Sequence, residues 1–392
     1  MSKTFIFIAI AALVVYAGSN YYLYRRSWQA FPPNPTWHLI YAILFAIVAL
    51  SFFIAMGLGN KLPLGVATVL ENIGAYWIIA FVFFLLVVDA LDLVRLANQH
   101  WKFYPPWVIN HYQQIKLITF FGTIGLFAIV CLLGHQRVRN PEIKQLDIEV
   151  AKNDNQGGEL RIVMVSDVHL GNTIRKNLLK KFVRLLNEQQ ADIILFAGDL
   201  IDHSMRPVEA HHLDEELRQL KAKYGVFGIP GNHEYYANMA KASDFYARSG
   251  ITLLRDTALT IDNRFVLIGR NDVTQHRRKP LDEILRGVDT HRPTILLDHN
   301  PSKIRDAVNQ QIDLQLSGHT HDGQLFPINL IVRGMYELSY GYRQIGNTHI
   351  YVSSGLGLWA APIRIGTRSE IVRINMHFPL SLNKFTSDTN IP

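Results

Sequence analysis

The first third of the sequence contains four apolar stretches, each close to the length of about 20 residues that a helix needs to cross a lipid bilayer. They cover approximately residues 4–24, 38–58, 73–93 and 117–134. Trp and Tyr side chains stand near their ends, as is typical of helices that end at a membrane interface. Four such runs are difficult to bury in a small soluble domain. The sequence therefore predicts an N-terminal all-α transmembrane bundle of four helices over residues 1–140.

The distribution of charge supports this assignment. The 392-residue chain has a net charge of +7, which on its own would suggest a nucleic-acid-binding protein. Residues 1–140, however, contain nine Lys and Arg against three acidic residues, whereas residues 141–392 contain 30 against 29. The positive excess thus belongs to the loops and ends of the membrane segments. We expect the lipid bilayer as a partner and no stable nucleic-acid partner.

Two features of this anchor stay open. In the first stretch, Lys3 and an apolar run precede the small residues Ala17, Gly18 and Ser19, so a cleaved signal peptide is an alternative to a membrane span. In the third stretch, Asp89 and Asp92 lie near the end, and we expect local pairing with Arg95. Basic residues flank both sides of the predicted bundle equally, so they do not orient it. The prediction is a multi-pass protein of the cell membrane, with the side of the C-terminal domain undetermined.

The pattern changes after Pro141. A polar linker is expected over residues 141–159, and a C-terminal tail over residues 377–392. Between them, over residues 160–376, short apolar runs alternate with helical candidates at residues 176–189, 213–222 and 237–248. The apolar runs lie at residues 162–165, 193–197, 226–229, 265–268, 295–297, 314–316 and 350–352. This alternation predicts an α/β domain.

Polar side chains follow five of these strands at the point where each ends. Open α/β sheets bind ligands at the carboxyl ends of their strands. The side chains offer oxygen and imidazole nitrogen without a thiolate, a donor set that suits Mn, Fe or Zn in a reactive site. The residues are Asp167 and His169, then Asp199 and Asp202, Asn232 and His233, His299, and finally His319 and His321.

In order along the chain, these residues spell D-x-H, G-D-x-x-D, G-N-H-E, a single His and G-H-x-H. Over about residues 160–374 this series resembles the calcineurin-like metallophosphoesterase superfamily. The membrane spans before it, and the later segment GLGLWAAPIRIGTRSEIVRI, resemble the transmembrane branch of that superfamily. The resemblance implies a β-sandwich flanked by helices, with a site for two divalent metal ions.

The resemblance also implies a role for each motif residue. Asp167, His169 and His321 would hold one metal, Asn232, His299 and His319 the other, and Asp199 would bridge both. His233 would face the substrate as a catalytic residue, oriented by Asp202. In such sites a hydroxide bridging the two metals attacks phosphorus, while the cations neutralise the phosphoryl oxygens.

Several residues near the motifs are not assigned as metal ligands. Asp322 stands where relatives often have Gly, and we expect it to affect metal affinity or the shape of the site mouth. Asp298 precedes His299 and should point to the opposite face of its strand. Asp272 either lies beside the ligands or is a turn residue. The histidines without a motif are interpreted as surface residues: His203, His211, His212, His276 and His291.

Two segments bear on the substrate. The basic amphipathic stretch Arg175–Glu188 could lie on anionic lipid, although packing with a solvated basic face is favoured. The apolar run Leu325–Val332 fits equally a lipid-facing rim of the site or a place in the core.

The function predicted is that of a membrane-tethered dimetal phosphohydrolase. Its substrate would be a phosphodiester, phosphomonoester or pyrophosphate, and whether that substrate is lipid-linked stays open. Cleavage of nucleic-acid phosphodiesters also stays open, since the same chemistry would apply. The alternative is a membrane sensor or scaffold with a non-catalytic phosphoesterase fold, for which lost ligands would be the sign.

Overall fold

The chain divides into a helical unit and an α/β unit, and the boundary between residues 133 and 134 falls within a single helix. The computed structural model describes residues 3–152 and 157–379. The predicted tail therefore lies outside the described residues from residue 380 onward.

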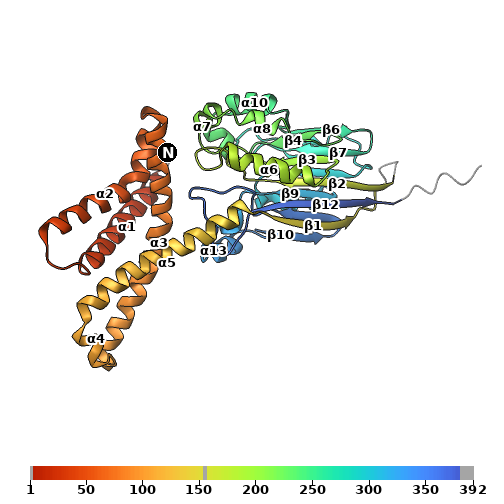
Figure 1. Ribbon diagram of the computed structural model, residues 1–392. Coiled ribbons are helices and arrows are strands. Elements are labelled where there is room, and N and C mark those ends of the chain that lie inside the picture. The colour runs from red at the N-terminus through yellow and green to blue at the C-terminus, as the bar shows by residue number, and fades with distance from the viewer. Residues whose placement is uncertain (1–2, 153–156, 380–392) are drawn as a thin grey trace, which may run out of the picture. The chain divides into compact units, whose positions relative to one another are not determined.

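The helical unit consists of long helices joined by short connections (Figure 1). Three of its helices, α2, α3 and α5, are long and apolar enough to cross a membrane. The first predicted stretch lies in α1. Among the residues that the structure describes, α1 does not meet the same criteria of length and apolar character, so a bundle of four spans is not confirmed. The elements are α1 (Lys3–Trp28), α2 (Pro35–Leu58), η1 (Gly59–Lys61), α3 (Leu64–Trp101), α4 (Pro106–Asn110) and α5 (Tyr112–Arg139).

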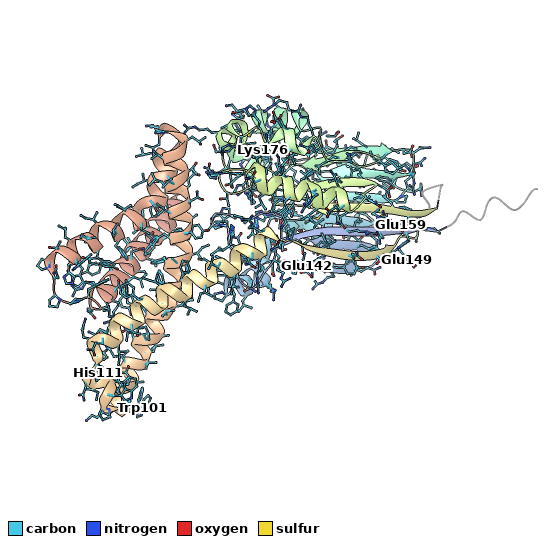
Figure 2. All side chains as sticks on the ribbon, in the orientation of Figure 1. Trp101, His111, Glu142, Glu149, Glu159 and Lys176 are labelled. Atoms are coloured by element: carbon cyan, nitrogen blue, oxygen red, sulfur yellow. The ribbon has the colours of Figure 1, made fainter. Side chains whose placement is uncertain are left out.

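Helix α3 is longer than its apolar stretch, because it begins directly after Pro63 and continues to Trp101, which Figure 2 labels. Gly74 of α3 lies against α2, and a Cβ added there would be 2.5 Å from Cα of Phe52. Small residues allow this kind of close helix contact in membranes. Asp92 pairs with Arg26 of α1 and accepts a 2.6 Å hydrogen bond from Tyr22 Oη, instead of pairing with Arg95 as predicted.

The α/β unit contains two six-stranded mixed sheets. In the first, the strand order is β1-β12-β2-β3-β4-β5, and β2, β3 and β4 are parallel neighbours. In the second, the order is β10-β11-β9-β8-β7-β6, and β7, β8 and β9 are parallel. The first sheet comprises β1 (Glu142–Glu149), β2 (Gly158–Val165), β3 (Ile193–Ala197), β4 (Val226–Ile229), β5 (Thr252–Leu253) and β12 (Glu370–Phe378); the second comprises β6 (Thr257–Ile261), β7 (Phe265–Gly269), β8 (Thr294–Leu297), β9 (Leu314–Ser317), β10 (Gly341–Ile345) and β11 (Thr348–Val352).

The two sheets pack face to face with helices on their outer faces, as the resemblance implied (Figure 1). Alternate residues of a strand point to opposite faces. Ile162 and Met164 of β2 thus lie in the core between the sheets, while Val163 and Val165 pack under helices. The helices and short turns are α6 (Lys176–Glu188), α7 (Met205–Ala210), α8 (Asp214–Leu217), α9 (Asn232–Tyr236), α10 (Met239–Arg248), α11 (Leu281–Ile284), η2 (Pro301–Lys303), α12 (Ile304–Asn309), η3 (His321–Gly323) and α13 (Ile328–Met335).

The range expected to be a linker contains β1, whose ends Glu142 and Glu149 are labelled in Figure 2. This strand runs parallel to β12 along its whole length. It is an edge strand with mostly half-exposed or exposed side chains, so its apolar signal is weak and depends on its partner. Most of residues 141–149 therefore belongs to the first sheet.

Helix α6 packs its apolar side against the domain core, which is the interpretation that its sequence favoured. Leu179, Phe182 and Val183 are buried in the core beneath the first sheet. On its outer side, Lys176 Nζ lies 2.9 Å from Glu215 Oε2 and 3.6 Å from Glu216 Oε1. The basic cluster is thus partly neutralised within its own domain.

Candidate metal centre

The parallel strands of both sheets end at one edge of the sandwich, and the motif residues meet there. Ligand atoms within 4.8 Å of one another form three overlapping groups. They are Asp167, His169 and His321; His169, Asp199 and His233; and Asp199, His299 and His319. Because His169 and Asp199 are each shared by two groups, the side chains form one continuous cluster.

The backbone turns sharply directly after these strands. Five motif residues adopt positive φ angles between 49° and 71°, the left-handed region that non-glycine residues rarely occupy. Conformations of this kind are costly and concentrate at functional sites. The residues are Asp167, His169, Asp199, His319 and His321.

Two glycines of the motifs leave space for the carboxylates. A Cβ added to Gly231 would overlap the carboxylate of Asp199, and one added to Gly318 would overlap that of Asp167. The G-N-H-E and G-H-x-H segments can therefore approach the two acids only with glycine at these positions.

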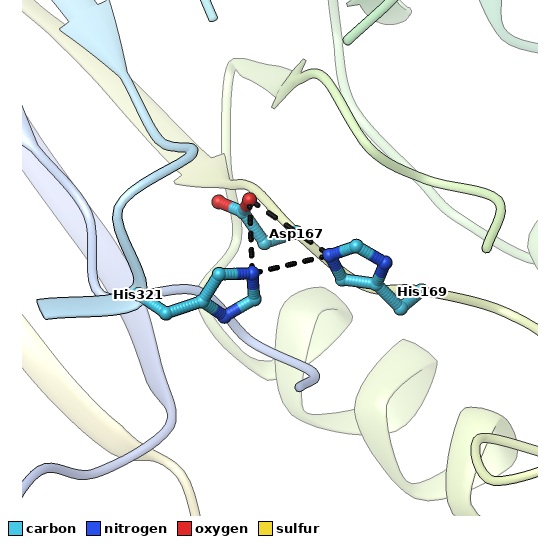
Figure 3. A group of neighbouring side chains, drawn as sticks. All are labelled: Asp167, His169 and His321. Carbon is cyan, nitrogen blue, oxygen red and sulfur yellow. Dashed lines mark hydrogen bonds and ion pairs between the residues drawn. The ribbon is translucent and has the colours of Figure 1, made fainter. Parts of the chain in front are cut away.

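The first group brings three donors to a common point (Figure 3). Oδ1 of Asp167 lies 3.4 Å from Nε2 of His321 and 4.0 Å from Nε2 of His169. The two Nε2 atoms are 3.1 Å apart. Adjacent ligands that each lie about 2.1 Å from an ion are about 3 Å apart at right angles. The spacing therefore fits donors that share a cation.

The third group, Asp199, His299 and His319, gives the stronger test of fit. His299 Nδ1 lies 2.7 Å from the carbonyl oxygen of Ala197, which can only accept, so Nδ1 carries a proton. In the neutral ring Nε2 then has a lone pair, and it faces Oδ2 of Asp199 at 3.1 Å. This buried Nε2 has no hydrogen-bond partner among the residues that the structure describes. Two acceptors this close require a proton or a metal cation between them.

The electrostatics of this pair agree. Burial alone would lower the pKa of His299, but the Asp199 carboxylate raises it well above its usual range. The site therefore favours a cation, and a divalent metal fits the oxygen and nitrogen donor set. Asn232 completes this side, with its Oδ1 3.0 Å from Nδ1 of His319.

Asp199 lies between the histidines of the first group and those of the third. Its Oδ2 is 3.1 Å from Nε2 of His299 and 3.8 Å from Nε2 of His169. A carboxylate in this place can contact a cation held by either group, which is the position expected of a bridging ligand.

His233 lies at the partly exposed side of the cluster. Its Nδ1 is 3.1 Å from Oδ1 of Asp202, and its backbone N–H donates to Oδ1 of Asp199 at 2.9 Å. Its ring packs edge-on against the ring of His169. Asp202 Oδ1 also lies 3.4 Å from Nδ1 of His169, so one carboxylate contacts both imidazoles.

Glu234 and Arg364 support the centre, although sequence analysis assigned neither a role. The buried Glu234 carboxylate accepts hydrogen bonds from the backbone N–H of Asp199, Ile201 and Gly231. Burial and the nearby Asp199 carboxylate raise the pKa of Glu234 to about 7. In the sequence, Glu234 was marked only by its place as the last residue of the G-N-H-E motif.

Arg364 is fully buried, and burial lowers its pKa to about 10. Its guanidinium donates to the carbonyls of Ser354 at 2.6 Å and Gly357 at 2.8 Å. The N–H of Gly357 in turn donates to the carbonyl of Asp167 at 2.9 Å. Arg364 thus holds the loop that contacts the backbone of Asp167, and it lies in the C-terminal segment that carried part of the resemblance.

The other acids near the motifs are engaged elsewhere. Asp298 pairs with Arg270 and Arg278. Asp272 Oδ1 accepts from the N–H of Thr274, as in a turn, while its buried Oδ2 has no partner among the described residues.

Two residues beside the motifs make specific contacts. Asp322 accepts from Nε and Nη2 of Arg333 at 3.1 and 2.9 Å. The interpretation of His203 as a plain surface residue was incomplete, because its Nδ1 lies 3.0 Å from Oδ2 of Asp202.

Comparison with known proteins identifies similar chains. A family model described as calcineurin-like phosphoesterase matches residues 160–323. An uncharacterized metallophosphoesterase of Helicobacter pylori strain J99 is 35% identical over 65% of this chain and 70% of its own length. One of Campylobacter jejuni is 27% identical over 95% of this chain and 98% of its own. A Danio rerio protein named transmembrane protein with metallophosphoesterase domain is 28% identical over 87% of this chain and 80% of its own. The last two similarities include much of the helical unit.

Proposed function

The chain belongs to the calcineurin-like metallophosphoesterase family, and we propose that it is a membrane-tethered, metal-dependent hydrolase of phosphoesters. This proposal rests mainly on one contact. Two buried acceptor atoms, Nε2 of His299 and Oδ2 of Asp199, lie 3.1 Å apart. Such a pair is stable with a cation between them, and the surrounding side chains supply the remaining donors.

Seven residues would hold two divalent cations of Mn, Fe or Zn. When bound, the cations would supply Lewis-acid charge for the phosphoryl oxygens and lower the pKa of the attacking water. Asp199 would contact both. The residues are Asp167, His169, His321, Asn232, His299, His319 and Asp199.

His233 is proposed to act on the substrate. Its Nδ1 is directed at Oδ1 of Asp202, which fixes the ring and leaves Nε2 for the phosphoryl or leaving-group oxygen. A protonated Nε2 would donate to that oxygen as charge develops on it. The carboxylate of Asp202 would stabilise this protonated ring.

Glu234 has a positioning role in this scheme. Its carboxylate joins the turn after β3 to the turn after β4 through three backbone N–H groups. It would keep Asp199 and Asn232 at the separation that shared ligation requires.

The anchor is proposed to be multi-pass and to lie in the cell membrane, with α1 as a fourth span beside α2, α3 and α5. We assign residues 1–140 to this anchor and the strands from β1 to β12 to the catalytic domain. A tether of this kind supports a substrate held in the membrane. We therefore favour a lipid-linked phosphodiester or pyrophosphate over a soluble phosphomonoester.

A sensor or scaffold with an inactive fold would be expected to have lost metal ligands, and all seven are present in this chain. The proposal can be tested with the full chain purified in detergent with Mn²⁺, using bis-p-nitrophenyl phosphate. Asp199→Asn should lower kcat/KM about 100-fold or more, because metal ions contribute several kcal/mol to transition-state stabilisation. His291→Ala, an exposed histidine outside the motifs, is the matched control. Full activity in Asp199→Asn would overturn the assigned site.

The substrate class needs a second assay. Rates on a polyprenyl pyrophosphate in mixed micelles would be compared with rates on p-nitrophenyl phosphate and on DNA. Faster cleavage of the micellar pyrophosphate is expected, and a preference for either of the others would remove the lipid-linked assignment without affecting the metal centre.

A further inference from the structure

An apolar surface lies next to the G-H-x-H segment, on and beside helix α13. Ile331 is 66% exposed, Met335 67% and Trp359 54%. We call this the α13 surface, and its full membership is Phe326, Ile328, Leu330, Ile331, Met335 and Trp359, all of them exposed. Clusters of large exposed apolar side chains usually mark a site of protein or membrane contact.

The orientation of α13 is the reverse of that of a helix on a water-facing surface. Ile328, Ile331 and Met335 follow helical spacing and point outward. Asn329 points inward and is buried. A Cβ added to Gly323 would lie 2.5 Å from Cα of Asn329, so the two backbones are in close contact. A helix between a protein and water places its apolar stripe inward. Here the polar residue is inside and the apolar stripe outside, which indicates a non-aqueous environment on the outer side.

Hydrogen bonds hold the parts of this surface together. The side chain of Gln324 donates to the carbonyl of Trp359 and accepts from its N–H, both at 2.8 Å. The N–H of Phe326 donates to the carbonyl of Ile365 at 2.8 Å. The loop that bears Trp359 and the segment that leads into α13 are therefore one structural block.

The same loop is joined to the end of a membrane-spanning candidate. The N–H of Arg364 donates to the carbonyl of Gly134 at 3.2 Å, and Nδ1 of His135 lies 3.1 Å from the carbonyl of Pro362. Gly134 and His135 follow directly on the apolar run of α5. The loop is thus fixed to α5 at the C-terminal end of its apolar run.

We propose that the α13 surface inserts into the interfacial layer of the phospholipid bilayer that α5 crosses. Amphipathic helices bury apolar side chains about 5–10 Å into this layer, and Trp prefers it. Arg137 and Arg139, both exposed in the last turn of α5, suit the phosphates at the same level.

The contact has a consequence for the metal centre. Arg333 of α13 holds Asp322, which follows His321 in the chain. Insertion of α13 would therefore fix the turn that carries His321 at the membrane surface, where a lipid-linked phosphate would arrive. This consequence rests on the proposed function, whereas the membrane contact itself does not.

The test uses the full chain with Cys131→Ser, reconstituted into vesicles of phosphatidylcholine and phosphatidylglycerol. A nitrobenzoxadiazole label is attached to Met335→Cys or to Lys221→Cys, an exposed position just before β4 and so at the opposite edge of the sheet from the metal centre. Doxyl-labelled lipids should quench the label at residue 335 at least about threefold more than the label at residue 221. Equal quenching would overturn the proposal. Shielding of residue 335 that depends on protein concentration and not on doxyl lipid would assign the surface to a second copy and would also overturn it.

A second variant addresses the cause. Ile331→Glu should reduce the quenching at residue 335 by about half or more, because a charged side chain resists entry into the apolar layer. Leu259→Glu, a partly exposed apolar residue of β6, is the matched control and should leave the quenching unchanged. Neither measurement requires turnover, so hydrolysis of bis-p-nitrophenyl phosphate in the same vesicles tests the proposed function separately.

Discussion

Nδ1 of His233 lies 3.1 Å from Oδ1 of Asp202, and the ring itself stays partly exposed to solvent. The carboxylate therefore fixes a ring that is placed to meet an incoming substrate. This hydrogen bond to Asp202 sets the orientation of the His233 ring.

His233→Ala should lower kcat on bis-p-nitrophenyl phosphate by about 100-fold, the lower end of the range for general acid–base catalysis. Asp202→Asn should cause a smaller loss, because the amide still contacts the ring but no longer stabilises its protonated form. Both are assayed at saturating Mn²⁺, since Asp202 also contacts His169. An unchanged kcat in His233→Ala, with normal metal content, would show that another group meets the substrate.

Removal of metal should lower both activity and thermal stability. Without a cation, His299 Nε2 and Asp199 Oδ2 face one another at 3.1 Å in a buried place. A ligand present at 100 times its Kd stabilises a protein by about 2.7 kcal/mol. EDTA should therefore lower the Tm of the full chain in detergent, and Mn²⁺ should restore it.

The control for this experiment is His299→Ala, whose Tm should respond less to EDTA than that of the wild type. If chelation left both activity and Tm of the wild type unchanged, the cluster would not be a metal centre.

Arg364→Lys should destabilise the catalytic domain by about 1–3 kcal/mol, the cost of leaving a buried polar group without a partner. Lysine cannot reach the carbonyls of Ser354 and Gly357 with the same planar geometry. The Tm is followed by intrinsic fluorescence, and Arg368→Lys, an exposed residue of the same segment, should change it little. Equal Tm values for the two variants would remove the supporting role of Arg364.

Glu370 should make stability depend on pH. Its carboxylate accepts from Tyr340 Oη at 3.0 Å, and burial raises its pKa above the ordinary value of 4.5. Between 4.5 and that raised pKa, the folded state binds more protons than the unfolded state, so the free energy of unfolding falls as pH rises.

Glu370→Gln should therefore flatten the decline of Tm that begins as the pH rises above 4.5, relative to the wild type. The exposed acid Glu283 provides the control, Glu283→Gln, which should keep the wild-type slope. An identical slope in Glu370→Gln and the wild type would show that Glu370 does not titrate in this window.

The sequence was sufficient for those parts of the fold whose signal is local. Fully buried strands such as β3 and β4 were predicted at their observed ends, because every side chain in them is apolar or small. The edge strands β1 and β10 were missed, since most of their side chains are half-exposed or exposed and mixed in polarity. Their assignment depends on a partner strand that is remote in sequence.

The same division applies to the site. The motifs placed nine side chains at strand ends, and the structure brings them into one cluster. Individual side-chain contacts were beyond reach, as with Arg364, which holds a loop, and His203, which contacts Asp202. The partner of Asp92 was mispredicted for that reason, because Arg26 comes from another helix.

The left-handed backbone at five motif residues, from Asp167 to His321, sets a limit on how this centre can be altered. A residue with a Cβ is held there against its own conformational preference, so the ligand positions oppose the stability of the fold that carries them. Glycine at any of them would relieve the strain while removing the donor. A substitution that relaxes the backbone at one of these positions would thus also remove a donor from the proposed centre.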